Sequence, residues 1–342
     1  MSAATFGIDA VRISIEVDSA PAQSPGFSMV GLPDTAVREA YSRVRSALAN
    51  CGLKYPPGSH LTVNLSPADV RKEGSGFDLP IAIGILIVSE ILHPVHLEGR
   101  VFVGELSLDG SLAPIRGALS ISSAFVGADD VEEVIVPAQN AAEAAAVGAI
   151  DVIGVPHLPA LVDHLRGESR IDPERSVVDF SEPSDLADFS EVRGQAQTKR
   201  ALEVAAAGSH NVMMIGPPGS GKTMLARRLP SILPRLTLEE SIVTTKIHSV
   251  SGHLGNGHGL VARRPFRAPH HTISNAGLVG GGSLPRPGEV SLAHNGVLFL
   301  DELPEFRRDV LEVLRQPLED GHVTISRAMR TLTFPSRFTL AA

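Results

Sequence analysis

The feature that most constrains this chain is a short glycine-rich segment, residues 216–223, which reads Gly-Pro-Pro-Gly-Ser-Gly-Lys-Thr. It satisfies the pattern G-x-x-x-x-G-K-[ST] and stands between an apolar run at residues 212–215 and a helix-period run at residues 223–233. A strand, a glycine loop and a helix in this order fold so that backbone amides surround phosphate groups. The segment therefore predicts a phosphate-binding loop in an α/β domain.

Each residue type in this loop has an expected role. The amides of Gly219, Ser220 and Gly221 point at phosphate oxygens, helped by the positive end of the following helix. Lys222 reaches the β- and γ-phosphates of ATP, and Thr223 supplies a hydroxyl to Mg²⁺. We therefore predict a binding set for ATP with Mg²⁺ that comprises Gly216, Pro217, Pro218, Gly219, Ser220, Gly221, Lys222, Thr223 and Met224.

A second segment, residues 297–302, is an apolar run that ends in the two acids Asp301 and Glu302. Ligands of parallel sheets bind at the carboxyl ends of strands, so these acids are expected beside the phosphate loop. Asp301 is predicted to hold the Mg²⁺ shell, and Glu302 to orient and polarise the attacking water. Taken alone, an apolar strand that ends in solvated acids is common. Together with the loop it predicts ATP hydrolysis, with Lys222 and Glu302 as the catalytic residues.

Length, charge and composition narrow the classes of protein to which the chain can belong. The 342 residues are enough for two domains, and the net charge of −8 argues against a protein that coats nucleic acid by bulk charge. Aromatic residues make up 4%, so any DNA contact should be mainly to phosphates. The single cysteine, Cys51, fits a reducing cytoplasm, and no secretion signal or membrane span is expected.

Periodicity and polarity divide the chain into three parts. Residues 1–166 alternate strand-like and helix-like runs, which indicates an α+β domain. Residues 167–184 are polar and contain proline, which is typical of a linker. Residues 185–342 carry the phosphate loop and the acidic strand. The expected elements are strands at 11–17, 61–65, 151–155, 212–215 and 323–326, and helices at 35–48, 79–92, 158–165, 195–207, 223–233 and 308–318.

The second domain resembles AAA+ ATPases, and within them the magnesium-chelatase-like group with its ComM/YifB family. The resemblance rests on five segments: Val-Arg-Gly-Gln at 192–195, Arg-Pro-Phe-Arg-Ala-Pro-His-His-Thr at 264–272, three glycines at 280–282, residues 287–296, and residues 314–327. It implies an α/β P-loop core assembled as a hexameric ring. By the same resemblance, the ring is a cytoplasmic DNA translocase that promotes branch migration during recombination of incoming DNA.

The same resemblance raises an expectation about the chain's end. An AAA+ core continues into a sensor strand, an arginine finger and a helical lid, whereas this sequence stops at Ala342. We therefore expect the chain to be a C-terminally truncated fragment with an incomplete core. Two alternatives to the DNA motor stay open: an ATPase subunit of a magnesium chelatase, and a truncated remnant that binds nucleotide without hydrolysing it.

The first domain is similar to the proteolytic domain of Lon over residues 61–140. Residues 72–76, Lys-Glu-Gly-Ser-Gly, parallel the segment that carries the Lon serine, and residues 104–117 parallel the segment before its lysine. Gly76 then stands at the serine and Leu119 at the lysine, and neither can act as nucleophile or base. A shifted register would offer Ser75, but no lysine stands where its partner should be. The resemblance implies a non-proteolytic domain of the ribosomal S5 domain 2-like fold.

Histidines and arginines outside these motifs supply weaker candidates. Five basic residues form the densest positive stretch, as candidates for DNA or pore-loop contacts: Arg263, Arg264, Arg267, His270 and His271. Solvated surface and pairing with acids of a neighbouring subunit are the competing readings. If they bind DNA phosphates, exchanging Arg264 and Arg267 for alanine should weaken binding and flatten its salt dependence. A histidine tract at 248, 253 and 258 lacks an acid or cysteine, so we interpret it as a polar loop rather than a metal site.

Overall fold

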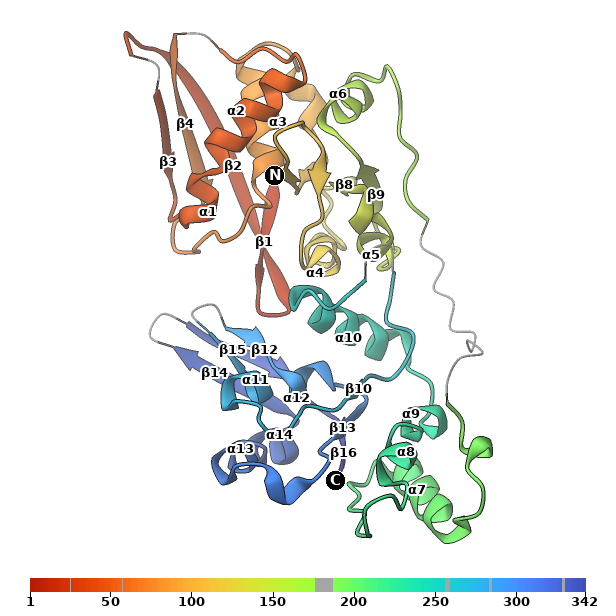
Figure 1. The fold of residues 1–342 in the computed structure, drawn as a ribbon. Helices are drawn as coiled ribbons and strands as arrows, with labels where there is room; N and C mark the ends of the chain where they lie inside the picture. The colour runs from red at the N-terminus through yellow and green to blue at the C-terminus, as the bar shows by residue number, and fades with distance from the viewer. Residues whose placement is uncertain (25, 57, 176–186, 256–258, 283–284, 328–329) are drawn as a thin grey trace. The chain divides into compact units, whose positions relative to one another are not determined.

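A computed structural model describes the chain except residues 25, 57, 176–186, 256–258, 283–284 and 328–329 (Figure 1). It separates into two compact units: unit 1 is Met1–Val177 with Gly255–Gly259, and unit 2 is Val178–Leu254 with Leu260–Ala342. The predicted linker lies outside the described residues from residue 176 to its end. Its first part is attached to unit 1, because the Glu174 amide donates to the Val152 carbonyl at 2.8 Å.

Unit 1 contains a four-stranded sheet in the order β1-β2-β4-β3. Its strands are β1 (Ser2–Phe6), β2 (Asp9–Pro21), β4 (Ser59–Ser66) and β3 (Gly26–Val30). Only the β3–β4 pair is parallel. Alternate residues of β4 are buried, as expected for a strand with one face on a core. The predicted strands at 11–17 and 61–65 are confirmed within β2 and β4.

Three helices of unit 1 contribute to the same core: α1 (Thr35–Arg38), α2 (Ala40–Asn50) and α3 (Asp78–Val88). The helix predicted at 35–48 is interrupted at Glu39. The helix predicted at 79–92 ends at Val88, because Glu90 adopts a left-handed φ of +59° and the Ile91 amide turns back to the Leu86 carbonyl at 2.9 Å.

The second sheet of unit 1 is parallel and has the order β5-β8-β9. Its strands are β5 (Arg100–Phe102), β8 (Glu133–Pro137) and β9 (Asp151–Val155). The remaining elements are β6 (Glu105–Leu106) and β7 (Leu112–Ala113), which pair as a hairpin, helices α4 (Ala118–Ser123), α5 (Ala141–Ala145) and α6 (Leu158–Arg166), and the 3₁₀ turns Pro94–Leu97 and Ala138–Asn140. The predicted strand at 151–155 and helix at 158–165 are confirmed.

Unit 2 is built on a parallel sheet in the order β10-β13-β16. Its strands are β10 (Phe266–Arg267), β13 (Val297–Phe299) and β16 (Thr339–Ala341). The strand predicted at 212–215 is reduced to a single parallel bridge between Val212 and Ala341. Beyond the bridge, Met213 is 64% exposed and Ile215 is 92% exposed. The predicted strand is therefore wrong except at Val212, where the chain bridges to β16.

The helices of unit 2 are α7 (Ala196–Gly208), α8 (Lys222–Ala226), α9 (Leu229–Ile232), α10 (Leu238–Val250), α11 (Asn275–Val279), α12 (Glu289–Leu292), α13 (Arg308–Glu312) and α14 (Arg315–Asp320), with 3₁₀ turns at Phe189–Glu191 and Leu303–Glu305. Two small antiparallel pairs complete it: β11 (Gly280–Gly281) with β12 (Arg286–Pro287), and β14 (His322–Arg327) with β15 (Arg330–Pro335). The helices predicted at 223–233 and 308–318 are each split in two.

An apolar cluster joins the helices around the phosphate loop to the sheet of unit 2. Leu202 of α7, Leu225 of α8 and Leu229 of α9 pack with Val297 and Phe299 of β13. Burial of these side chains fixes the helix that follows the loop against the strand that precedes the acids. In the part of the chain that the structure describes, no helix is long and apolar enough to cross a membrane.

Candidate nucleotide-binding site

The phosphate loop runs from the sheet edge to the start of α8. The Met214 amide donates to the Ala342 carbonyl at 2.7 Å, which ties the chain before the loop to β16. Gly219 and Gly221 have φ of +77° and +88°, a region that side chains with a Cβ rarely adopt. Among the described residues, no acceptor is bonded to the amide of Gly219 or Gly221. The Ser220 amide, also predicted to face phosphate oxygens, instead donates to the Pro217 carbonyl at 3.3 Å. Two free amides in a glycine loop at a helix start fit phosphate oxygens.

The side chain of Lys222 is folded back over the loop. Its ammonium donates to the Gly216 carbonyl at 2.8 Å and to the Pro217 carbonyl at 3.2 Å. The hydroxyl of Ser220 is buried and has no hydrogen-bond partner in the described chain. The loop therefore presents a cation held by neutral carbonyls and an unsatisfied hydroxyl, which an anionic ligand would complement.

The loop and the acidic strand meet through Thr223 and Asp301. The Thr223 hydroxyl, in the first turn of α8, donates to Asp301 Oδ2 at 2.7 Å. Asp301 follows β13 by two residues, and its other oxygen accepts the Glu302 amide at 3.1 Å. A hydroxyl and a carboxylate that converge at this distance are the hard oxygen donors that Mg²⁺ prefers. The residues present therefore fit the metal ion that the sequence predicts.

Glu302 lies at a strained point of the backbone. Its φ is +54°, a left-handed conformation that costs a residue with a Cβ on the order of 1 kcal/mol. The Glu305 amide donates to the Glu302 carbonyl at 2.8 Å and closes the turn that holds this conformation. The side chain is exposed. An open carboxylate on a fixed, strained turn is compatible with the predicted role in polarising water.

Two supporting contacts were not anticipated from the sequence. Gln195, at the start of α7, donates through Nε2 to the Ser220 carbonyl of the loop at 3.1 Å. Arg228 donates to the carbonyls of Met224 and Asp188 at 3.1 and 3.0 Å, so it links the segment after α8 to the chain before α7. Gln195 falls within the Val-Arg-Gly-Gln segment, which was noted only as a family resemblance. Arg228 carried no signal.

The predicted basic stretch does not form one surface. Arg267 pairs with Glu289 through two bonds of 2.6 and 2.7 Å. Arg264 is bonded to Glu240 and to backbone carbonyls, and its side chain is 14% exposed. Arg263 is exposed. Two of the three guanidiniums are thus paired within the same unit rather than offered to a ligand, and contact of this stretch with DNA stays a prediction.

The two histidines of this stretch lie near the turn that follows the acids. The rings of His270 and His271 have centroids 4.0 Å apart, and His271 meets Phe306 edge-on at 6.4 Å.

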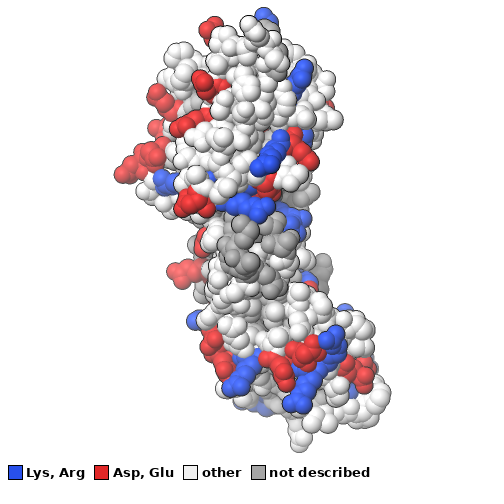
Figure 2. All heavy atoms as spheres, turned by 90° about the vertical axis from the view of Figure 1, so that its left-hand side faces the viewer, with Lys and Arg blue, Asp and Glu red and all other residues white. Residues whose placement is uncertain are grey.

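On the face that Figure 2 shows, Lys and Arg lie among Asp and Glu in both units. Unit 2 contains exposed ion pairs, among them Arg308–Glu312 and Arg315–Glu319.

The histidine tract does not make a metal site in the described chain. His248, on α10, is bonded through Nε2 to the Leu292 carbonyl at 3.0 Å, and burial lowers its pKa. The described residues hold no cluster of three side chains that could bind a metal ion. His258 lies outside the described residues.

In unit 1, the residues that parallel the Lon catalytic segments are buried or already hydrogen-bonded. Leu119, Ser75 and Lys72 show this, and we call their part of unit 1 the closed corner. Leu119 is 0% exposed, and its amide donates to Glu143 Oε1 at 3.0 Å. Ser75 donates its hydroxyl to Glu105 Oε2. The buried ammonium of Lys72 donates to the Pro67 carbonyl. Ser75 and Lys72 thus have separate partners, and no serine–lysine pair is formed by the described side chains in this corner.

Two protein families match separate parts of the chain. The family described as "Magnesium chelatase, subunit ChlI" matches residues 188–342, and the one described as "Subunit ChlI of Mg-chelatase" matches residues 15–140. Competence protein ComM of Haemophilus influenzae is 47% identical over 346 residues, covering 100% of this chain and 67% of its own length. The protein YifB of Escherichia coli is 44% identical over 342 residues, covering 99% of this chain and 66% of its own length.

A weaker similarity concerns unit 1. Lon protease 2 of Bacillus subtilis is 29% identical over 148 residues, which cover 41% of this chain and 26% of that protease. The chain spans about two thirds of the length of ComM and YifB. The expectation that it is a fragment stays a prediction.

Proposed function

The chain belongs to the magnesium-chelatase-like AAA+ family of ComM and YifB, and from this premise we propose that it is the ATP-binding part of a motor that moves on DNA. The observation that carries the proposal is the bond between Thr223 and Asp301 beside a glycine loop with free amides. AAA+ relatives of this kind support ATPase activity for the whole protein. Movement on DNA and branch migration during natural transformation are the finer parts of the proposal.

The residues divide the work of hydrolysis between them. When bound, Mg²⁺ would supply positive charge against the negative phosphates. The Gly219 and Gly221 amides bind phosphate oxygens, and the Lys222 ammonium leaves two neutral carbonyls for an anionic partner. Thr223 and Asp301 hold the metal ion. Glu302 orients a water molecule and takes its proton.

The DNA part of the proposal rests on different support. The name of the relative ComM refers to competence, and the basic stretch at 263–271 leaves Arg263 and His270 as its exposed members, with His271 partly buried beside Phe306. We propose that a hexameric ring of the whole protein brings such groups to DNA phosphates. Contacts of this kind are independent of base sequence and sensitive to salt.

The test is ATP hydrolysis by the chain and by a full-length relative, each without DNA, with duplex and with a four-way junction. Lys222→Ala serves as the blank in both proteins. Stimulation of the full-length protein by junctions is the expected result. Hydrolysis that ignores every DNA substrate would remove the DNA motor and leave an ATPase of another purpose.

A second candidate is the ATPase subunit of a magnesium chelatase, since both family descriptions that match the chain carry that name. The Lon-like similarity of unit 1 favours the first candidate. A porphyrin substrate added to the same assay separates them. Hydrolysis that responds to porphyrin and not to DNA would reverse the order.

A further inference from the structure

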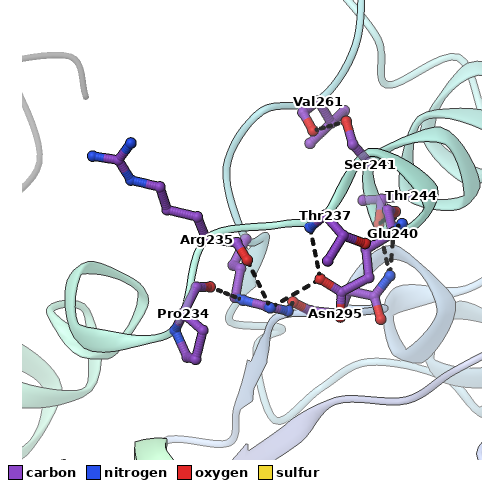
Figure 3. A network of polar contacts seen from close by, with 9 residues as sticks. Pro234, Arg235, Thr237, Glu240, Ser241, Thr244, Val261 and Asn295 are labelled. Carbon is purple, nitrogen blue, oxygen red and sulfur yellow. Dashed lines mark hydrogen bonds and ion pairs between the residues drawn. The ribbon is translucent and has the colours of Figure 1, made fainter. Parts of the chain in front are cut away.

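Arg264, a predicted DNA contact, uses its three guanidinium nitrogens in hydrogen bonds within the chain. Nε donates to the Pro234 carbonyl, and Nη1 donates to the Asn295 carbonyl at 2.7 Å. Nη2 donates to Glu240 Oε2 at 3.0 Å and to the Arg235 carbonyl at 3.3 Å (Figure 3 labels these partners). One guanidinium thus bonds three backbone carbonyls and one carboxylate.

The carboxylate partner belongs to the first turn of α10. Glu240 Oε2 also accepts the Thr237 amide at 3.1 Å, and the Thr237 hydroxyl accepts the Glu240 amide at 3.2 Å. This reciprocal cap fixes the start of the helix. Arg264 therefore bonds a carboxylate whose own position is set by the helix, which leaves the pair little freedom to move.

The third carbonyl partner belongs to a strained residue. Asn295 has a φ of +59°, and its amide donates to the Arg337 carbonyl at 2.6 Å. Its side-chain amide donates to the Glu240 carbonyl at 3.3 Å and to the Thr244 hydroxyl at 3.2 Å. Asn295 is thus held from α10 by two side-chain bonds and from Arg264 by one bond to its carbonyl, as Figure 3 shows for the α10 side.

These partners come from the two segments that must meet at the nucleotide site. Pro234 and Arg235 follow α9, and α9 follows α8, which carries Lys222 and Thr223. Asn295 stands two residues before β13, and Asp301 stands two residues after it. β13 is paired on one side with β10 and on the other with β16, so it moves as a rigid piece.

We propose that Arg264 is a positioning residue that sets Asp301 opposite Thr223. It does so by clamping the chain that leaves the phosphate-loop helices to the turn that begins the acidic strand. The inference rests on the proposed function of the Thr223–Asp301 pair in holding Mg²⁺ with a nucleotide. Arg264 itself contacts neither Mg²⁺ nor the nucleotide in this proposal.

The clamp requires the planar fork of arginine. A guanidinium presents five N–H donors in a fixed plane, whereas a lysine ammonium presents three at one point and cannot reach separated carbonyls together. Arg264→Lys therefore keeps the charge beside Glu240 and removes the bridge between the two segments. The neighbouring Arg263 is exposed, so Arg263→Lys is a matched control.

The experiment measures the affinity of a fluorescent ATP analogue in excess Mg²⁺ and in EDTA, with a thermal melt of each variant. We expect Mg²⁺ to strengthen binding to the wild-type chain and to Arg263→Lys. Arg264→Lys should bind as the wild type does in EDTA and lose about tenfold of its affinity in Mg²⁺, the effect of one charge-assisted hydrogen bond. A role in stability alone would lower the melting temperature without changing the response to Mg²⁺.

A double-variant cycle with Thr223→Ala makes the test specific. If Arg264 acts through the Thr223–Asp301 pair, Arg264→Lys adds nothing to the loss already caused by Thr223→Ala. Additive losses would overturn the proposal. Should Arg264→Lys fail to fold, Glu240→Gln serves instead, because it removes the charge of the partner and keeps an oxygen for the Thr237 amide.

The outcomes distinguish this inference from the proposed function. A wild-type chain that binds no ATP analogue contradicts the nucleotide site itself. A wild-type chain that binds with help from Mg²⁺, together with an Arg264→Lys variant that does the same, overturns the positioning role and leaves the site intact.

Discussion

Sequence resemblance points to catalysis in one region of each unit: the Lon-like segment around Gly76 in unit 1, which includes Asp78, and the phosphate loop with its two acids in unit 2. We call them the closed corner and the open corner, because their polar groups differ in how many hydrogen bonds they already make. In unit 1, the Asp78 carboxylate takes two bonds from Arg43 at 2.7 and 2.9 Å. It also accepts the Leu106 amide at 3.2 Å. In unit 2, the loop leaves amides of two glycines without an acceptor among the described residues.

The difference teaches which corner can still bind a ligand. A group that already has its hydrogen bonds gains little from a substrate, whereas a free amide beside a cation gains a full charge-assisted bond. Leu119 is buried where a base would be needed, while Lys222 and Glu302 stay accessible. Similarity to a protease therefore survives in the fold of unit 1, and the capacity to bind a charged ligand is concentrated in unit 2.

The largest expected effect comes from removing the cation of the open corner. Lys222→Ala should lower ATP hydrolysis of the full-length protein by about two orders of magnitude or more, because charge on the phosphates loses its partner. The matched change in the closed corner, Ser75→Ala, should leave the rate unchanged. Steady-state hydrolysis of both variants checks the contrast, and equal losses would break it.

The closed corner of unit 1 can be tested by placing a lysine at Leu119, the position that parallels the Lon lysine. Leu119→Lys places an ammonium at a fully buried site and should lower the free energy of unfolding by about 3 kcal/mol or more. Leu119→Met conserves volume and should cost less than about 1.5 kcal/mol. Denaturant titration measures both. A lysine variant of wild-type stability that gains peptidase activity together with Gly76→Ser would refute the closed corner.

Acid should weaken unit 2 through a histidine that is kept neutral. His294 is 6% exposed, and burial, with a smaller contribution from Arg337, lowers its pKa to about 4. The pKa of this histidine is about 6.5 in the unfolded chain, so between pH 6.5 and pH 4 the unfolded chain binds more protons than the folded chain. The free energy of unfolding therefore falls by about 3 kcal/mol as the pH drops through that range.

The variant that isolates this contribution is His294→Asn. Its side-chain oxygen can replace His294 Nδ1 as acceptor for the Arg337 amide, a bond of 3.0 Å, but it does not titrate. Unfolding free energies at several pH values should then show a shallower acid slope than in the wild type. An unchanged slope would assign the acid sensitivity to other groups, of which His248 is one with a lowered pKa.

The smallest expected effect concerns the outward group of the basic stretch. Arg263→Gln should weaken DNA binding of the full-length protein modestly and reduce the slope of log affinity against log salt by about one. Arg267→Gln, which breaks the pair with Glu289, should act on stability instead. Filter binding at several salt concentrations checks the first, and an unchanged slope would exclude Arg263 as a phosphate contact.

Local patterns in the sequence predicted some of the elements of this chain correctly. The glycine loop, the acids after β13 and the strands within β2, β4 and β9 all follow from periodicity and residue type. Some helix breaks had a local signal: Pro230 stands in the first turn of α9, inside the single helix predicted at 223–233. Glu39, between α1 and α2, carries no proline or glycine to signal its interruption.

The contacts that organise the site were beyond local reading. The charged neighbours of Arg264 indicate a DNA contact, whereas the side chain is bonded to residues 24 to 31 positions away. An arginine in a sequence reveals its charge but not its partner. Asn295 lies in the segment 287–296 that carries the family resemblance, and asparagine favours the left-handed backbone that it adopts, but its bonds to α10 are not visible in the sequence.

The measurement that tests the central claim most directly is calorimetric titration of ATP with Mg²⁺ into this chain, Lys222→Ala and Ser75→Ala in parallel. The account predicts saturable binding to the chain, the same binding to Ser75→Ala, and loss of binding in Lys222→Ala. Absence of binding to the unaltered chain, or binding that survives Lys222→Ala, would contradict the assignment of the open corner in unit 2 as the nucleotide site.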